Sequence, residues 1–319
     1  LRMSQLLKKL KRKYKHYVHY FHYTMNCIIN IKRFFYDQIL VNVLLLFSFI
    51  FISCSPSLAI LKFNPEFAKS TYKYIAEKSE KAIINSPNDE KKLLKACENL
   101  TKFSFGFTLE EADRKVMIDY KNGKFLYKEA HEKFVRAVDY GERALAVKFD
   151  NYRDWIKNNT SKSPNFTTLD LSYLYWTAGA YGGAIKSSQG DPEWIVKLPR
   201  LGKLLEMGLS LDSEWNKGAF YSAMISYTMI RHDSPSNKEA VAREYFNKAV
   251  KVSNDFDLSP YLTFAESVSI TTQNKNEFTN LLYKALNIDI NTDPDLRLTN
   301  YINRNRAIWL LDNIDEYFY

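Results

Sequence analysis

The most distinctive chemical context in the chain belongs to Cys54, a thiol that directly follows an apolar run. The run covers the 14 residues 39–52 and is interrupted only twice by a polar residue. A helix needs about 20 apolar residues to cross a bilayer, so this run is too short to span one comfortably. Lys32 and Arg33 precede the run and the small residue Ser53 follows it. Basic residues, a short apolar core and a small residue in this order are typical of a secretory signal peptide.

The tetrad formed by Phe51, Ile52, Ser53 and Cys54 resembles a bacterial lipobox, in which a lipid is attached to the cysteine and the signal is cut just before it. Phe51 stands where a lipobox usually has Leu. The resemblance implies a lipoprotein held on a bacterial membrane through Cys54. An uncleaved anchor helix and an ordinary signal followed by a chance cysteine are the alternatives, and we favour the lipoprotein over both.

Cleavage before Cys54 divides the chain into a leader (1–53), a lipid-anchored tether (54–63) and one all-helical domain (64–319). The leader contains nine Lys or Arg and one acid, a net charge of +8, which leaves about +1 of the total +9 for the rest. Because the basic charge lies in the leader, it does not indicate nucleic-acid binding. The chain opens on Leu1, and a start at Met25 is expected to give a signal of ordinary length.

The remaining residues offer little that could perform catalysis. Beyond the leader the histidines are His131 and His232, and Cys97 is the one thiol after Cys54. The phosphate-binding loop, nucleophile-elbow, zinc-helix and paired-cysteine motifs are absent from the sequence. The acidic loop 289–295 has Pro294 where a calcium-binding loop needs Gly. We therefore expect no enzyme, no metal site and no cofactor, and we interpret the neighbouring Glu110 and Glu111 as a solvated helix face.

The elements that must position any site are predicted to be helices throughout, because helix start signals recur and strand patterns with a period of two are missing. The start signals are Ser86-Pro87, Asp191-Pro192, Ser259-Pro260 and Asp293-Pro294, together with a capping box formed by Thr108 and Glu111. The predicted helices cover 64–84, 87–104, 108–119, 124–149, 168–187, 192–210, 213–230, 237–253, 260–271, 275–287 and 294–316. The segment from Asn158 to Asn165 is the clearest linker.

Small and apolar residues recur in these helices at spacings of four and then three. The four triplets are Ala130, Phe134, Ala137; Leu201, Leu205, Gly208; Ala242, Phe246, Ala249; and Phe278, Leu282, Ala285, and their starts are 71, 41 and 36 residues apart. The second helix of a tetratricopeptide unit, whose repeat is roughly 34 residues, carries such a stripe against its neighbour. We therefore predict an all-α fold of degenerate tetratricopeptide-like helical hairpins, a superhelical α-solenoid. A helical bundle whose small residues recur by accident is the alternative.

Aromatic residues and glycines concentrate in the segment 173–185 (YLYWTAGAYGGAI). Glycine inside a helix costs about 1 kcal/mol relative to alanine, so several together indicate a packing or cavity constraint. We expect Tyr173 to lie in the core. Trp176 and Tyr181 are predicted to line a concave ligand passage, with Tyr221 and Trp309 as further lining candidates, because stacked helical hairpins curve and leave a groove or tunnel.

Four stretches in order resemble the T-component lipoproteins of tripartite ATP-independent periplasmic (TRAP) transporters. They are LYWTAGAYGGAI, DPEWIVKLPRLGKLLEMGLSLD, WNKGAFYSAMISY and NRNRAIWLLDNIDEYF, and the last carries a motif formed by Arg304, Arg306, Ala307, Trp309, Leu310 and Leu311. The resemblance spans about Phe67 to Phe318. Met207-Gly208 stands where the family tends to have Arg-Ala, which weakens any role for that arginine.

Membership implies an all-helical tetratricopeptide-like fold, a homotrimer, and a pore through each subunit suited to a hydrophobic small molecule. It also implies association with a periplasmic solute-binding protein. The sequence thus predicts a membrane-anchored periplasmic lipoprotein that docks a solute-binding protein and holds or passes an apolar ligand toward a TRAP transporter. A scaffold that binds a peptide or partner of the cell envelope without ligand passage is the alternative, and an exported hydrolase ranks third.

Replacing Cys54 with Ala should block lipidation and leave an unprocessed precursor, because the thiol is the predicted attachment point. Three acyl chains, each contributing about 0.8 kcal/mol per buried CH₂, would be lost with it. Labelling with a radioactive fatty acid checks the result. Incorporation into the Cys54→Ala variant would show that the anchor lies elsewhere.

Overall fold

The computed structural model describes residues 56–319, and there the predicted all-helical fold is confirmed, since these residues form helices and no strand. The leader 1–53, Met25 and Cys54 lie outside the described residues. No helix from residue 56 onward is both long and apolar enough to cross a membrane.

The α-helices are α2 (Pro56–Phe63), α3 (Pro65–Ile84), α4 (Glu90–Phe103), α5 (Glu110–Ile118), α6 (Tyr120–Lys148), α7 (Tyr152–Ile156), α8 (Leu171–Ser187), α9 (Pro192–Ile195), α10 (Leu198–Leu211), α11 (Trp215–Ile230), α12 (Lys238–Val252), α13 (Ser259–Phe264), α14 (Lys275–Asn287) and α15 (Arg297–Asp312). Two π-helices, η1 (Ser104–Leu109) and η3 (Ala265–Ser269), interrupt the helical runs, and η2 (Thr168–Asp170) and η4 (Ile314–Glu316) are short 3₁₀ turns.

The predicted helices match most of these elements closely; 275–287 coincides with α14. The predicted helix 192–210 is two helices, since the chain turns at Val196 and Lys197 before Leu198 begins α10. Helix α2 occupies most of the segment predicted as a tether, and α7 lies where no helix was predicted.

Of the four helix starts predicted at a proline, two are wrong and two are confirmed. Helix α13 begins at Ser259 with Pro260 in its first turn, although Leu258 and not Ser259 is its N-cap. Asp191 caps α9 by accepting a hydrogen bond from the backbone N–H of Glu193 at 2.9 Å. Ser86 does not start a helix, because Asp89 caps α4 instead. Asp293 precedes α15 by several residues and accepts from the N–H of Asp295 in a turn.

The predicted capping box is also wrong, because no helix begins there. Thr108 is buried inside η1, which continues α4 directly into α5. Glu111 pairs with Lys69 of α3 at 2.6 Å instead of reaching back to a backbone N–H.

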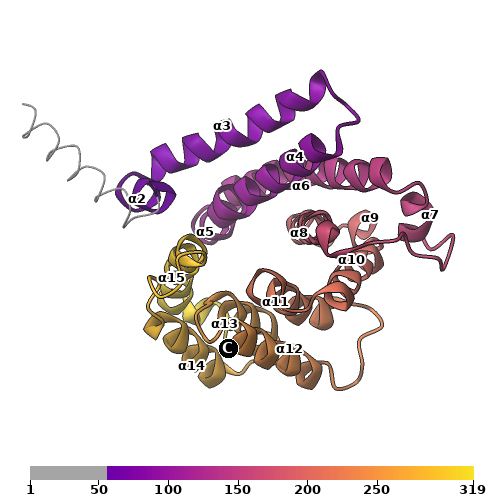
Figure 1. Cartoon of the computed structure of the whole chain (residues 1–319). Helices are drawn as coiled ribbons and strands as arrows, with labels where there is room; N and C mark the ends of the chain where they lie inside the picture. Colours follow the sequence, from indigo (N-terminus) through magenta and orange to yellow (C-terminus); the bar gives the residue numbers. More distant parts are fainter. Residues whose placement is uncertain (1–55) are drawn as a thin grey trace, which may run out of the picture. The chain divides into compact units, whose positions relative to one another are not determined.

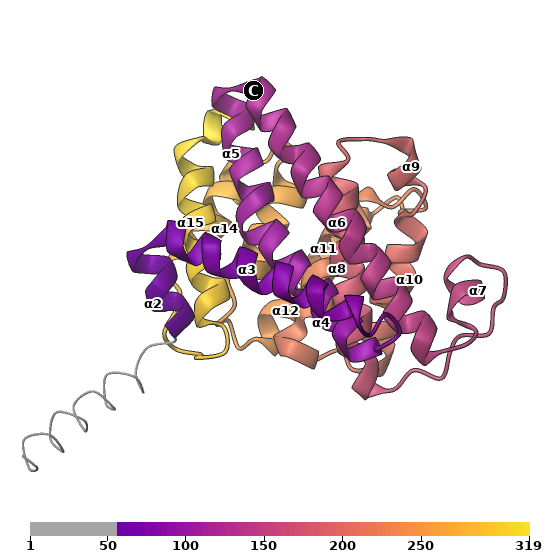
Figure 2. The same ribbon diagram turned by 90° about the horizontal axis from the view of Figure 1, so that it is seen from above.

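The helices pack largely in chain order and curve round within the unit from residue 57 onward. Helix α3 packs on α4, α4 on α6, α6 on α8, α8 on α10, and α11 on α12. The last helix, α15, lies beside α5 (Figures 1 and 2). The predicted triplets occupy the packed faces: Ala130, Phe134 and Ala137 of α6 are fully buried, for example.

The apolar interior consists of two separate clusters. The first core joins α3, α4, α6, α8 and α10, with Leu93, Phe134 and Leu174 fully buried in it. The second core joins α12 to α15 and buries Phe264 and Phe278. Helix α11 contributes to both clusters and is therefore their common wall.

Two neighbouring glycines of α8 face different surroundings. A Cβ added at Gly183 would lie 2.2 Å from Cε1 of the buried Phe134 ring, so only glycine lets α6 approach here. A Cβ added at Gly182 would meet no atom within 4 Å. One side of α8 is thus closely packed and an adjacent side is open.

Gly182→Ala should therefore raise the free energy of unfolding by about 0.5–1 kcal/mol, because alanine favours the helix and meets no obstacle. Gly183→Ala should lower it by about 1–3 kcal/mol through overpacking against Phe134. Urea unfolding followed by circular dichroism measures both. Equal effects of the two substitutions would contradict this arrangement of α8.

Candidate functional site

A stripe on α8 is formed by Tyr175, Gly179, Gly182 and Lys186. Spacings of four, three and four place these residues on one face of the helix. The stripe is open at Gly182, whereas a Cβ added at Gly179 would contact Cγ2 of Thr101 on α4 at 3.6 Å. Tyr175 lies at one end, where its ring contacts those of Trp215 and Phe220 with centroids 5.2 and 5.5 Å away. Lys186 lies at the other end and its Nζ is 3.3 Å from Oδ2 of Asp113 on α5. The stripe therefore leads from an aromatic group to a charged one.

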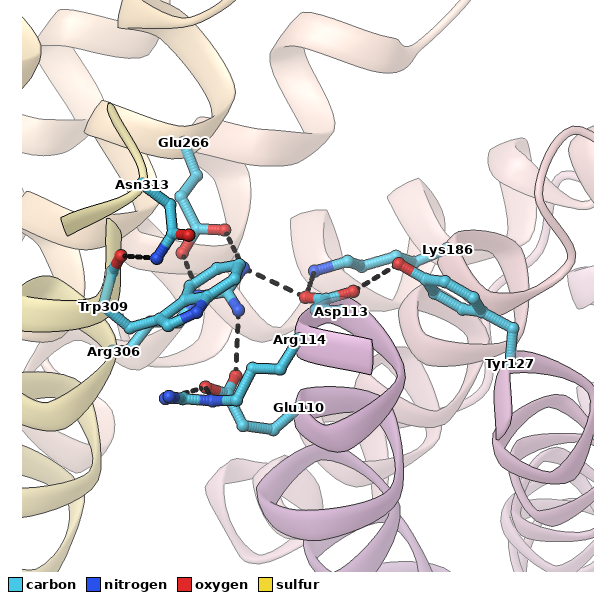
Figure 3. Close-up of polar contacts among 9 residues, drawn as sticks. All are labelled: Glu110, Asp113, Arg114, Tyr127, Lys186, Glu266, Arg306, Trp309 and Asn313. Atoms are coloured by element: carbon cyan, nitrogen blue, oxygen red, sulfur yellow. Dashed lines mark hydrogen bonds and ion pairs between the residues drawn. The ribbon is translucent and has the colours of Figure 1, made fainter. Parts of the chain in front are cut away.

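The charged group is centred on the guanidinium of Arg306 in α15, whose side chain is only 11% exposed. Nη1 lies 3.0 Å from Oε2 of Glu110, and Nη2 lies 3.0 Å from Oδ2 of Asp113 and 2.8 Å from Oε2 of Glu266. Glu110 and Asp113 are on α5, whereas Glu266 is on η3, so one side chain joins three segments (Figure 3). We call these residues, with the partners described next, the Arg306 cluster.

The carboxylates of α5 have further partners. Arg114 donates to Oε1 of Glu110 from Nε and Nη2, at 2.9 and 2.6 Å. The hydroxyl of Tyr127 on α6 donates to Oδ1 of Asp113 at 2.5 Å. With Lys186, the cluster contains three carboxylates and three cations. A buried charge is tolerated only when it is paired, and this balance meets that requirement.

Trp309 of α15 lies beside the two arginines. The guanidinium carbon of Arg306 lies 4.6 Å from the centroid of the Trp309 ring. The guanidinium carbon of Arg114 lies 5.2 Å from the same centroid. Both cations are within the range of a cation–π interaction. The indole thus adds contacts to α5 and α15 at once.

The pKa values of the cluster reflect its charges. Burial alone would raise the pKa of the Asp113 carboxyl, but Lys186 and Arg306 outweigh it and hold the pKa below its ordinary value. Burial would lower the pKa of Arg306, but Glu266, Glu110 and Asp113 raise it instead. Burial and the charge of Asp113 both raise the pKa of Tyr127. Asp113 and Arg306 are therefore both ionised at neutral pH, and the Tyr127 hydroxyl keeps its proton.

Both π-helices adjoin the cluster. Glu266 is part of η3, and η1 ends immediately before Glu110. Helical segments with a π turn are rare and occur frequently at functional sites. Their position here indicates that the carboxylates are set by local departures from α-helical geometry.

The residues predicted to line a passage lie in different surroundings. Trp176 is partly buried beneath Lys102, whose Nζ is 4.7 Å from a ring centroid. Tyr181 is 1% exposed, and its hydroxyl donates to Glu142. Tyr221 stacks loosely on Tyr245 at 6.2 Å.

Of the four lining candidates, Trp309 alone belongs to the Arg306 cluster. The expected core residue Tyr173 is 6% exposed and lies in the first core. The role of the four lining candidates stays a prediction.

Sequence reasoning missed the carboxylates of the cluster. The interpretation of Glu110 as solvated is wrong, because its side chain is 25% exposed and paired with Arg114 and Arg306. The spacing of four between Glu110 and Arg114 was the available signal. Glu111, by contrast, is 47% exposed.

Comparison with known proteins now identifies the relatives of this chain. The family described as "TRAP transporter T-component" matches residues 76–318, which is more than half of the sequence. The chain belongs to the TRAP transporter T-component family. It is also 19% identical, over 197 residues, to an uncharacterized protein of Treponema pallidum (strain Nichols). That match covers 60% of this chain and 61% of the relative, so the chain spans less than two thirds of that protein.

The T-component motif at the C-terminus can now be located in space. Ala307 and Leu310 are fully buried and hold α15 in the second core. Arg306 and Trp309 reach toward α5, while Trp309 also packs against the second core and Arg306 also pairs with Glu266 (Figure 3). One helix thus uses its apolar face for packing and its charged residues for the cluster.

Asp113→Asn should lower the free energy of unfolding at pH 7 by about 3 kcal/mol, because a neutral amide leaves the buried cations underpaired. The depressed pKa of Asp113 means that its contribution is fully present above the ordinary pKa of 3.8. The contribution then disappears as the pH falls through the lower pKa of the folded state.

The difference in the free energy of unfolding between the wild type and Asp113→Asn should therefore be constant from pH 7 to about pH 5. It should shrink below about pH 4. Urea unfolding at a series of pH values measures it. A difference that stays unchanged down to about pH 2.5 would contradict the pairing of an ionised Asp113.

Proposed function

We propose that this T-component is an accessory lipoprotein of a TRAP-type transport system in the periplasm, held to the membrane through a lipid on Cys54. The family supports a role in TRAP transport. The lipobox-like tetrad and the signal-like run before it support the anchor.

The protein docks a periplasmic solute-binding protein and functions as a homotrimer of tetratricopeptide-like solenoids. Resemblance to the T-components supports the partner and the trimer. The solenoid is supported by helices that pack in chain order and by buried triplets such as Phe278, Leu282 and Ala285.

The ligand is an apolar small molecule that lies along the stripe of α8. The observation that carries this proposal is the open space next to Gly182, on the same face as Tyr175. A face that combines an aromatic ring with partly buried glycines suits an apolar molecule, because it offers contact area without charge. The cations at its far end are already paired within the Arg306 cluster, so a neutral cargo fits better than an anionic one.

We propose no enzymatic activity, since the charged groups described here pair with one another. A scaffold is the second candidate, and the surface of α3 favours it. Phe67 and Tyr74 of α3 are 56% and 62% exposed, and Phe63 of α2 is 80% exposed, which is apolar area that a protein partner would cover.

Gly182→Trp should abolish binding of the apolar dye N-phenyl-1-naphthylamine while the protein stays folded. The indole would occupy the stripe, and no packed atom lies next to the added Cβ. Dye fluorescence in titration measures binding, and thermal unfolding by circular dichroism reports the fold.

Ser70→Trp on the exposed surface of α3 is the matched control, since it adds the same side chain away from the stripe. It should bind dye as the wild type does. Unchanged binding in Gly182→Trp, or equal loss in both variants, would leave the scaffold as the function.

A further inference from the structure

The two apolar cores are joined in chemically different ways at their two junctions. At the first junction α11 supplies side chains to both: Phe220 and Met224 belong to the first core, and Ile225 and Met229 to the second. This junction is apolar and continuous within one helix. The cores cannot separate here without exposing buried apolar surface to water.

At the second junction α15 meets α5, and the contact is ionic. The bonds that cross it run from Arg306 to Glu110 and Asp113, and the cation–π contact of Arg114 with Trp309 adds to them. Extensive helix packing between α5 and α15 is absent from the described residues. The third carboxylate, Glu266, belongs to the same core as Arg306, so its bond does not cross the junction.

An ionic junction and an apolar junction differ in how water interacts with the groups that become exposed when the junction opens. Charged side chains that separate are solvated by water, which offsets much of the attraction that they lose. Apolar surfaces that separate gain no such compensation. A buried ion network is therefore a contact that can open and close with a smaller change in free energy than a packed core of similar size.

From this contrast we infer that the Arg306 cluster is a latch. The second core, with α13 to α15, swings away from α5 about the α11 wall, and the bonds from Arg306 to Glu110 and Asp113 break and reform. The stripe of α8 ends at this junction, because Lys186 contacts Asp113. Opening of the latch gives apolar cargo a lateral route to the stripe, and this part of the inference rests on the proposed function.

The π-helices η1 and η3 suit this motion, because each lies next to a carboxylate of the latch. Conversion of a π turn to an α turn rotates the residues that follow relative to those that precede. Such a conversion in η1 would turn Glu110 and Asp113 away from Arg306 together. The latch therefore has a local structural means of release on α5.

Distance measurement by pulsed electron paramagnetic resonance tests the latch in the full chain. Spin labels at Ile118→Cys on α5 and Ile308→Cys on α15, two exposed positions, report the ionic junction. Labels at Tyr283→Cys on α14 and Ile308→Cys report a distance within the second-core side. Cys27 and Cys54 are replaced by Ser, and the buried Cys97, whose burial raises its pKa to about 12, stays unlabelled.

Glu110→Gln removes an ion pair across the junction, whereas the matched control Glu266→Gln removes an ion pair to the same guanidinium within one core. The ratio of long to short distances between residues 118 and 308 should rise about tenfold or more in Glu110→Gln and stay within twofold of the wild type in Glu266→Gln. The distance between residues 283 and 308 should be unchanged in both.

The inference is overturned if Glu110→Gln leaves the junction distance as in the wild type. It is equally overturned if both variants broaden it alike, or if the distance within the second-core side broadens too, since these results describe general loosening. The measurement uses no ligand. It can therefore succeed when dye binding fails, and the latch and the proposed cargo are judged separately.

Discussion

The guanidinium of Arg306 constrains how the two ends of the domain meet, because it pairs α15 with carboxylates of α5. Glu110 and Arg306 are 196 positions apart in the sequence and their side chains lie 3.0 Å apart. A cation that is largely buried must keep its anionic partners, since each lost partner leaves a desolvated charge. The contact of α5 with α15 follows from this requirement, whereas η3 and α15 are already joined within the second core.

The other features of the molecule are arranged around this contact. One side of α8 packs into the first core, where Gly183 lies against Phe134. The other side is open at Gly182 and ends at Lys186, which contacts Asp113. Apolar packing thus fixes the frame, and the ionic group completes it. This division explains why the C-terminal segment of this chain mixes buried apolar residues with arginines: Leu310 holds α15 in the second core, and Arg306 reaches α5.

Much of the fold could be predicted from the sequence, because helix periodicity is a local property. The limits of α14 and the cap at Asp191 follow from residues within one turn of each other. The wrong starts at Ser86 and Thr108 arose because the same local signals also occur in turns and inside a continuous helix, and tertiary packing decides between them. Thr108 is an example: it is buried within η1, where no helix begins.

The site could be predicted only in part. The sequence singles out Trp309 only as a candidate lining residue of a ligand passage, and its contacts with Arg306 and Arg114 are not predicted. The pairing of Glu110 and Asp113 is not predicted either, since an acidic residue on an amphipathic helix looks solvated until its partner is known. That partner lies nearly 200 residues away, and neither spacing nor propensity carries information over such a separation.

The central claim is that Arg306 and Glu110 act on each other directly across the junction of the two cores. A double-mutant cycle with Arg306→Gln, Glu110→Gln and the double variant, measured by urea unfolding, tests it. We expect an interaction energy of about 1–3 kcal/mol, because the residues share a contact and a network. Additive effects, with an interaction energy below about 0.5 kcal/mol, would contradict the claim.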